Sequence, residues 1–328
     1  MEDAIDRLGP GQPSVLDTER GGPENDSMLP SRKLLLATAC AAGLLPGEPL
    51  RAQQEKAPDV ASPGLDFSVL APPQLEVARQ VLKSSFCYCG CPHTLDGCLR
   101  EHASCHHARR MASLVLRMAR RSMTEVAIEK VLTDYYASFD SHKRARLDVK
   151  AFGPPLGSAN AKVAIVEFSD FSCPYCQALR PELERFVQEN EGRVKLYYKP
   201  FPIASHPRAM EAALAVEWAR DKGLFWKMHD RLFENASAFS DDDLARQAAA
   251  SGGDPEDLRK ALEEGRNRTR IAASQGEARK AGLEGTPTLY LNGRRLNVPV
   301  PAGEMRDILL FTLEDEEEWM GHGGWARD

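Results

Sequence analysis

The chain has 328 residues, of which 42% are hydrophobic and 27% are charged, proportions that are ordinary for a soluble globular protein. Its formal net charge of −6 argues against a nucleic-acid-binding protein, because such a protein usually shows a basic face. The sequence contains no run of eighteen apolar residues, so no membrane-spanning helix is expected.

The first 52 residues predict an unfolded extension followed by a signal peptide. Residues 1–27 are rich in glycine, proline and acidic side chains, a composition that does not fold. Two basic residues then precede the uncharged run of residues 34–45, and a cut after Ala52 would complete an export signal. The signal fits a translation start at Met28, with Met1 as the alternative. We therefore expect a periplasmic protein.

Two other interpretations of this segment stay open. The apolar run is also compatible with a buried helix that ends abruptly at Pro46 and Pro49. In addition, the sequence "ATAC" up to Cys40 faintly resembles a bacterial lipid-attachment site, although Ala37 stands where leucine is usual.

Residues 53–143 predict a linker and a small helical domain. Residues 53–75 contain four prolines and little periodicity, which is typical of a linker. Residues 76–143 form a cysteine-rich segment with two amphipathic helical patterns, the first with apolar side chains from Met111 to Met118 on one face. Thr124 is placed to cap the second helix.

Residues 144–313 predict an α/β domain. Strands are expected over 145–152, 162–168 and 193–201, and the last two are joined by a helix, so they should run parallel. A helical block follows over about 204–281, then a hairpin with Asn292-Gly293 at its turn. A helix over roughly 303–313 completes the domain, and the acidic residues 314–328 are expected to form a flexible, solvated tail.

The stretch "FSCPYC" places Cys173 and Cys176 between a buried strand and a helix. Pro174 suits the first helical position, where a missing N–H has no cost. The helix start carries free amide donors and a partial positive charge, which stabilise a thiolate at Cys173. Cys176 lies one turn further along, so the pair is arranged for thiol–disulfide exchange.

Two other uses of this pair are compatible with its spacing. A zinc half-site would need further ligands from the same domain, and no cysteine follows Cys176. A static structural bridge would close only a short loop, which contributes little stability.

The segment "VAIVEFSDFSCPYC" resembles the active-site region of DsbA-like thioredoxin-fold proteins, which are exported thiol–disulfide oxidoreductases. The resemblance covers about 144–313 and implies a thioredoxin fold with an inserted helical domain. It implies that Glu167 is a buried acid serving Cys176. In "GLEGTPTLYLNG", Pro287 matches the family's cis-proline, and Thr286 matches the residue that pairs with substrate.

The same resemblance implies an enzyme that needs no cofactor and acts on exported protein thiols and disulfides, with a separate redox partner that resets the pair. Its members include oxidases and reductases. The exported compartment and the DsbA-like insertion favour disulfide donation. The alternatives are an exported reductase in cytochrome c or metal-centre maturation, and a metal-binding protein.

A second group of cysteines, Cys87, Cys89, Cys91, Cys98 and Cys105, precedes this domain. Three interpretations stay open: structural disulfides, of which an odd number of cysteines leaves one thiol over; a copper or zinc site; and exchange with the thiol pair of the α/β domain. The run "CYCGC" resembles a motif of small exported proteins, and residues 86–139 more loosely resemble the CcmH-type domain of cytochrome c maturation. His206 and His229 are expected to be surface or packing residues on helices.

Overall fold

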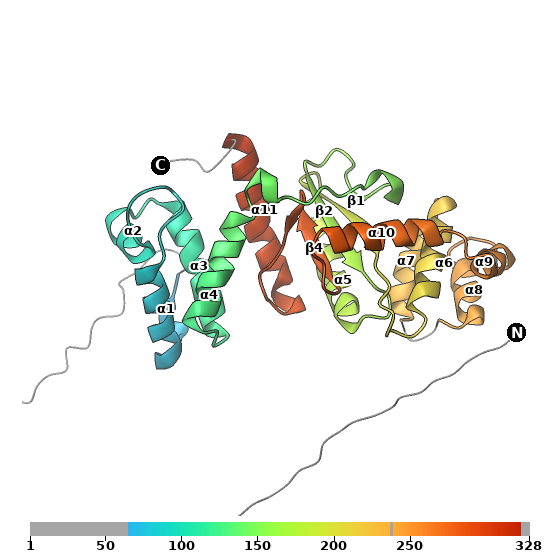
Figure 1. Cartoon of the computed structure of the whole chain (residues 1–328), viewed down its shortest axis with the longest axis horizontal. Coiled ribbons are helices and arrows are strands. Elements are labelled where there is room, and N and C mark those ends of the chain that lie inside the picture. Colours follow the sequence, from blue (N-terminus) through green and yellow to red (C-terminus); the bar gives the residue numbers. More distant parts are fainter. Residues whose placement is uncertain (1–64, 237–238, 323–328) are drawn as a thin grey trace, which may run out of the picture. The chain divides into compact units, whose positions relative to one another are not determined.

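The computed structural model describes residues 65–236 and 239–322 (Figure 1). The expected extension, the signal peptide, Met28 and Cys40 all lie outside the described residues. In the part of the chain that is described, no helix combines the length and the apolar character needed to cross a bilayer.

From residue 65 onward, four helices precede the α/β domain, and Figure 1 shows them gathered in one group. They are α1 (Pro72–Ser84), α2 (Leu95–Glu101), α3 (His106–Arg120) and α4 (Glu125–Ala137). The predicted apolar face of α3 is buried, and Thr124 caps α4 by accepting a hydrogen bond from the amide of Ala127, as expected. The linker predicted over residues 53–75 extends too far, because helix α1 already begins at Pro72. A proline is tolerated there, since the N–H that it lacks would have no partner in the first turn.

The α/β domain is built on a five-stranded sheet with the order β1-β3-β2-β4-β5. Its strands are β1 (Leu156–Gly157), β2 (Val163–Ser169), β3 (Val194–Pro200), β4 (Thr288–Leu291) and β5 (Arg294–Arg295). Strands β2 and β3 are parallel, as predicted, whereas β4 runs antiparallel to β2. The sheet is therefore mixed, and the expected thioredoxin-like architecture is confirmed.

Helices cover both faces of this sheet. On one face, α5 (Pro174–Glu189) and α11 (Met305–His322) pack Leu183 and Leu309 against Ile165. On the other face, α10 (Arg268–Lys280) places Ala278 against Val166. Alternate residues of β2 thus serve two separate cores, which explains why its sequence is apolar almost throughout.

The predicted helical block contains five helices. Besides α10, they are α6 (Ala209–Asp221), α7 (Phe225–Glu234), α8 (Asp241–Ala250) and α9 (Pro255–Glu263). The predicted capping box at the start of α8 is present, with Ser240 and Asp243 bonding each other's backbone amides. Figure 1 shows α6 to α9 as a second group of helices.

The hairpin at Asn292-Gly293 is also confirmed. Both residues have positive φ, 45° and 81°, as a two-residue hairpin turn requires. The backbone of Ala145 lies directly against Gly293, and its amide donates a hydrogen bond to the Gly293 carbonyl oxygen at 2.7 Å. A side chain at position 293 would clash with the Ala145 carbonyl oxygen. Glycine is therefore required at this position.

Two predicted elements are wrong. Residues 145–152 are not a strand but an irregular segment followed by a short 3₁₀ helix, and the first strand lies later, at Leu156–Gly157. The predicted flexible tail is helical as far as His322, within α11. Its acidic residues are not all solvated, because Asp315 and Glu316 are buried against arginine side chains.

Candidate functional site

The two thiols of the "CPYC" sequence lie at the start of α5. Cys173 is the N-cap residue with an extended backbone (φ −83°, ψ 119°), and Pro174 begins the helix. Cys173 is 3% exposed and Cys176 is fully buried, so only the first sulfur can be reached from outside. Tyr175 between them is 75% exposed, which makes it the most prominent side chain at this point of the surface.

The surroundings favour a thiolate at Cys173. A hydrogen bond from the Cys176 thiol and the backbone amides of Tyr175 and Cys176 lower the pKa of Cys173 to about 5. Burial and the neighbouring Cys173 raise the pKa of Cys176 well above its usual range. The two sulfurs therefore differ in both access and acidity, and the surroundings favour ionisation of the outer one.

A cis peptide bond joins Thr286 and Pro287, so the predicted geometry of this loop is confirmed. The Sγ atom of Cys173 lies 3.4 Å from the Thr286 carbonyl oxygen. Thr286 and Pro287 are half-buried beside the thiol. The loop therefore presents main-chain groups next to the reactive sulfur.

Glu167 lies on β2 and is buried, as predicted. Burial raises its pKa to about 7, and its charge in turn contributes to the raised pKa of Cys176. Among the described residues, one oxygen of this carboxyl group has no hydrogen-bond partner, and the same holds for the Tyr198 hydroxyl. Buried polar atoms of this kind are expected to have a function or to bind an ordered water.

The sequence analysis missed Asp170 and gave His206 no role at the site. Asp170 is buried three residues before Cys173, and its carboxylate lies 2.8 Å from Nδ1 of His206. His206 lies in a bend rather than on a helix, so its expected placement is wrong, whereas His229 is buried on α7 as a packing residue. The sequence does contain a signal for Asp170, because this aspartate directly follows the strand that leads into the thiol pair.

The cysteines of the N-terminal helices form a separate group. The sulfurs of Cys87, Cys89, Cys91 and Cys98 all lie within 4.8 Å of one another, a geometry that could hold a metal ion. The fifth sulfur, that of Cys105, lies 3.8 Å from the sulfur of Cys87. The sulfurs of the five cysteines are therefore neighbours in the fold.

Three further groups, which combine histidine and carboxylate side chains, also have their ligand atoms within 4.8 Å of one another. They are His93, Glu101 and His102; His106, His107 and Glu318; and Glu184, His229 and Asp230.

Comparison with known proteins agrees with this architecture. Residues 152–309 match the family model described as Thioredoxin. A curated relative, "Probable disulfide bond formation protein D" of Bacillus cereus, is 27% identical over 155 residues, which are 43% of this chain and 71% of that protein. Among solved structures, oxidised BdbD from Bacillus subtilis matches at 25% identity and a TM-score of 0.47, over 53% of this chain and 96% of that one.

The first curated relatives carry a different name. "Na(+)/H(+) antiporter NhaA 3" of Salinispora tropica is 35% identical over 144 residues, which are 44% of this chain. The chain spans only 22% of the length of that relative.

Residues 152–309 therefore form a thioredoxin-fold domain with its cysteine pair at the start of α5 and a cis-proline beside it. Within that fold, the helices α6 to α10 are inserted between β3 and β4, and a disulfide bond formation protein is among the proteins that this chain resembles.

Proposed function

We propose that the protein oxidises thiols of exported proteins. A client thiolate attacks Sγ of Cys173 in the Cys173–Cys176 disulfide, and Cys176 leaves as the thiolate. A second client thiolate then attacks the client sulfur of the mixed disulfide and releases Cys173 as a thiolate. The client gains a disulfide, and its two electrons reside on the reduced pair.

The observation that supports oxidation of client thiols, and not reduction of client disulfides, is the acidity of Cys173. Its pKa of about 5 means that the reduced pair holds a stable thiolate at neutral pH. Stabilising the reduced form makes the disulfide a stronger oxidant, which is how the most oxidising members of this class reach potentials of about −120 mV against about −270 mV for thioredoxin. An oxidase is therefore favoured over the alternative, an exported reductase.

The other site residues support this exchange. Glu167, with a pKa of about 7, is suited to give a proton to Cys176 when that sulfur leaves and to accept one when the disulfide forms again. Thr286 and Pro287 offer main-chain groups to an extended client segment. Tyr175 provides an exposed aromatic contact beside the sulfur.

Export is the second part of the proposal. The basic pair and apolar run before residue 46 support secretion to an oxidising compartment such as the periplasm, where disulfides persist. There the clients would be exported protein thiols, and a separate partner would have to reoxidise the pair.

The reduction potential of the Cys173–Cys176 couple tests the direction. Equilibration with glutathione buffers should give a value nearer to about −120 mV than to about −270 mV. Peptide oxidation should be fast, and Cys173→Ser should abolish it. A potential near that of thioredoxin, with efficient reduction of insulin, would instead favour the reductase. Full exchange activity in Cys173→Ser would refute the mechanism.

A further inference from the structure

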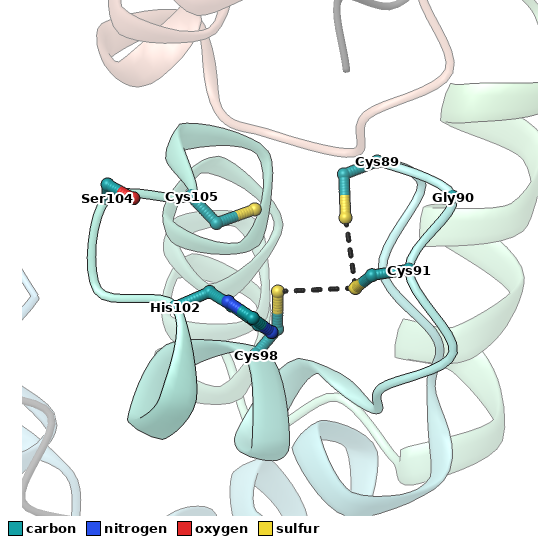
Figure 2. A pocket seen from close by; sticks show the side chains of 7 residues that line it. All are labelled: Cys89, Gly90, Cys91, Cys98, His102, Ser104 and Cys105. Atoms are coloured by element: carbon teal, nitrogen blue, oxygen red, sulfur yellow. Dashed lines mark hydrogen bonds between the residues drawn. The ribbon is translucent and has the colours of Figure 1, made fainter. Parts of the chain in front are cut away.

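The cysteine cluster formed by Cys87, Cys89, Cys91 and Cys98 has the geometry of a single binding site. The sulfur of Cys91 lies 3.1 Å from that of Cys89 and 3.6 Å from that of Cys98, and all four sulfurs are within 4.8 Å of one another. Figure 2 shows Cys89, Cys91 and Cys98 pointing their sulfurs toward a common point from different directions. The sulfurs therefore converge on one centre.

The backbone around these residues forms a closed scaffold. The amide of Leu95 donates to the Ser85 carbonyl oxygen at 2.8 Å, and the amide of Cys87 donates to the His93 carbonyl oxygen at 3.3 Å. The enclosed loop turns at Gly90, whose φ of 86° suits glycine. Thr94 then caps α2, which supplies Cys98. The loop and the helix thus hold their thiols in fixed positions.

The sulfur spacing fits one metal ion. A zinc–sulfur bond of about 2.3 Å places the sulfurs of a tetrahedral site about 3.8 Å apart. The separation of 3.6 Å between Cys91 and Cys98 is close to that value, and the separation of 3.1 Å between Cys89 and Cys91 is shorter. A ligand set made only of thiolates selects soft or borderline ions and disfavours Mg²⁺ and Ca²⁺, which prefer oxygen.

We propose that Cys87, Cys89, Cys91 and Cys98 bind one d¹⁰ cation, Zn²⁺ or Cu⁺, through four thiolates. Binding forms four metal–sulfur bonds and releases the thiol protons to solvent, with no electron transferred. The site is independent of the exchange reaction at Cys173 and Cys176, so either proposal can fail without the other.

Access agrees with this assignment. Cys89 and Cys91 are half-buried and line an open cavity of about 350 Å³, through which an ion can reach the cluster.

Pairing into disulfides explains the arrangement less well. Disulfides join sulfurs in twos, whereas the Cys91 sulfur has two sulfur neighbours at similar distances. Five cysteines cannot all pair within one chain in any case. Cys105 remains as a fifth thiol, with its sulfur 3.8 Å from that of Cys87 but outside the group of four, so its variant tests the ligand set.

The experiment measures metal content by mass spectrometry after anaerobic purification of the full chain. We expect about one equivalent of zinc or copper, and loss of at least about 100-fold in affinity in Cys89→Ser and Cys91→Ser, since even outer-shell changes cost about 10–100-fold. These two thiols are half-buried, so their variants should fold, which circular dichroism checks. Cys105→Ser should retain the ion.

Reconstitution of metal-free protein identifies the cation. Zn²⁺ and Cu⁺ are each titrated against a chelator, and Co²⁺ is used as a spectroscopic probe that should show the intense visible bands of tetrahedral thiolate coordination. A 1:1 complex with either Zn²⁺ or Cu⁺ supports the proposal.

Three results would overturn it. One is a metal-free protein whose cluster cysteines are mapped as disulfides under anaerobic conditions and which binds neither ion when reduced. Another is an equal loss of metal in Cys105→Ser and Cys89→Ser, which would mean a different ligand set. The third is loss of the metal in Cys173→Ser, which would place the ion at the exchange site.

Discussion

Asp170 and His206 are joined beside the thiol pair, with Nδ1 of the histidine 2.8 Å from a carboxylate oxygen of the aspartate. The same carboxylate accepts hydrogen bonds from the amides of Ser172 and Ile203, each at 2.8 Å. The amide of Cys173 in turn donates to the Asp170 carbonyl oxygen at 3.0 Å. One buried residue thus fixes the loop before Cys173 to the loop after β3.

Replacing Asp170 should therefore loosen the site and destabilise the fold. Asp170→Ala removes three hydrogen bonds to a charged acceptor and leaves two amides without that acceptor, so we expect the free energy of unfolding to fall by about 3 kcal/mol. Urea denaturation measures this change. Asp66→Ala is the control, because Asp66 is exposed and, among the described residues, its side chain accepts hydrogen bonds only from Ser68. Equal losses in the two variants would contradict the role of Asp170.

The hydrogen bond from Cys176 is the largest cause of the low Cys173 pKa, and a matched pair of variants isolates it. In Cys176→Ser a hydroxyl can still donate to the Cys173 thiolate, whereas in Cys176→Ala the side chain at position 176 has no donor and only the backbone amides remain. A hydrogen bond to a charged group contributes about 1.5–3 kcal/mol, or roughly one to two pKa units.

We therefore expect the Cys173 pKa to stay near 5 in Cys176→Ser and to rise by roughly one to two units in Cys176→Ala. Ultraviolet absorbance of the thiolate, followed as a function of pH, gives both values. The same pKa in the two variants would show that the helix start alone sets the acidity.

The local parts of this site were predictable from the sequence. The apolar run of β2, the proline after Cys173 and the spacing of the two thiols all act within a few residues, and each predicted the element observed. The "NG" turn is local as well, since both residues adopt the positive φ that they favour.

The parts that were missed depend on contacts between distant residues. The segment 145–152 has an apolar pattern, but its Ala145 amide is bonded to the hairpin at Gly293 rather than to a neighbouring strand. The acidic C-terminal run looks solvated in isolation. Arg110 lies 205 positions from its partner Asp315, and Arg144 lies 172 positions from its partner Glu316. Arg294, which also approaches Glu316, follows the hairpin turn, so no local pattern reveals any of these contacts.

Glu167 should give the stability of the protein a distinct pH dependence. Its pKa is about 7 in the fold, against an ordinary value of 4.5, so the folded state binds the proton more tightly than the unfolded chain. The favourable contribution is complete below the unfolded pKa and is lost as pH rises through about 7. The total fall is roughly 3 kcal/mol, at about 1.4 kcal/mol per pKa unit.

Glu167→Gln cannot ionise, so it should abolish this fall and unfold at higher denaturant concentration than the parent above pH 7. Measurements on the oxidised protein between pH 4 and pH 8 avoid titration of the thiols. Glu76→Gln, a change at an exposed glutamate on α1, should leave the profile unaltered. A parent protein whose stability is flat over this range would disprove the assignment.

A variant of Glu316 tests whether the acidic end of α11 is packed into the fold. It is fully buried, and its carboxylate accepts hydrogen bonds from both terminal nitrogens of Arg144, at 2.6 and 3.0 Å, and from the Asn292 side chain at 3.1 Å. Removing one partner of a buried ion pair leaves the other charge uncompensated, which costs about 3–5 kcal/mol. Glu316→Ala should therefore lower the free energy of unfolding by that amount.

The neighbouring Glu317 is the matched control. It pairs with Arg193 at 2.6 Å, but both side chains are more than one-third exposed, and such surface pairs contribute about 0–1 kcal/mol. Denaturant unfolding of the two variants should thus differ by at least about 2 kcal/mol. Equal stability of Glu316→Ala and Glu317→Ala would mean that this segment is the solvated tail that its sequence suggests. Removing an acidic residue from a mobile tail leaves no buried partner with an uncompensated charge.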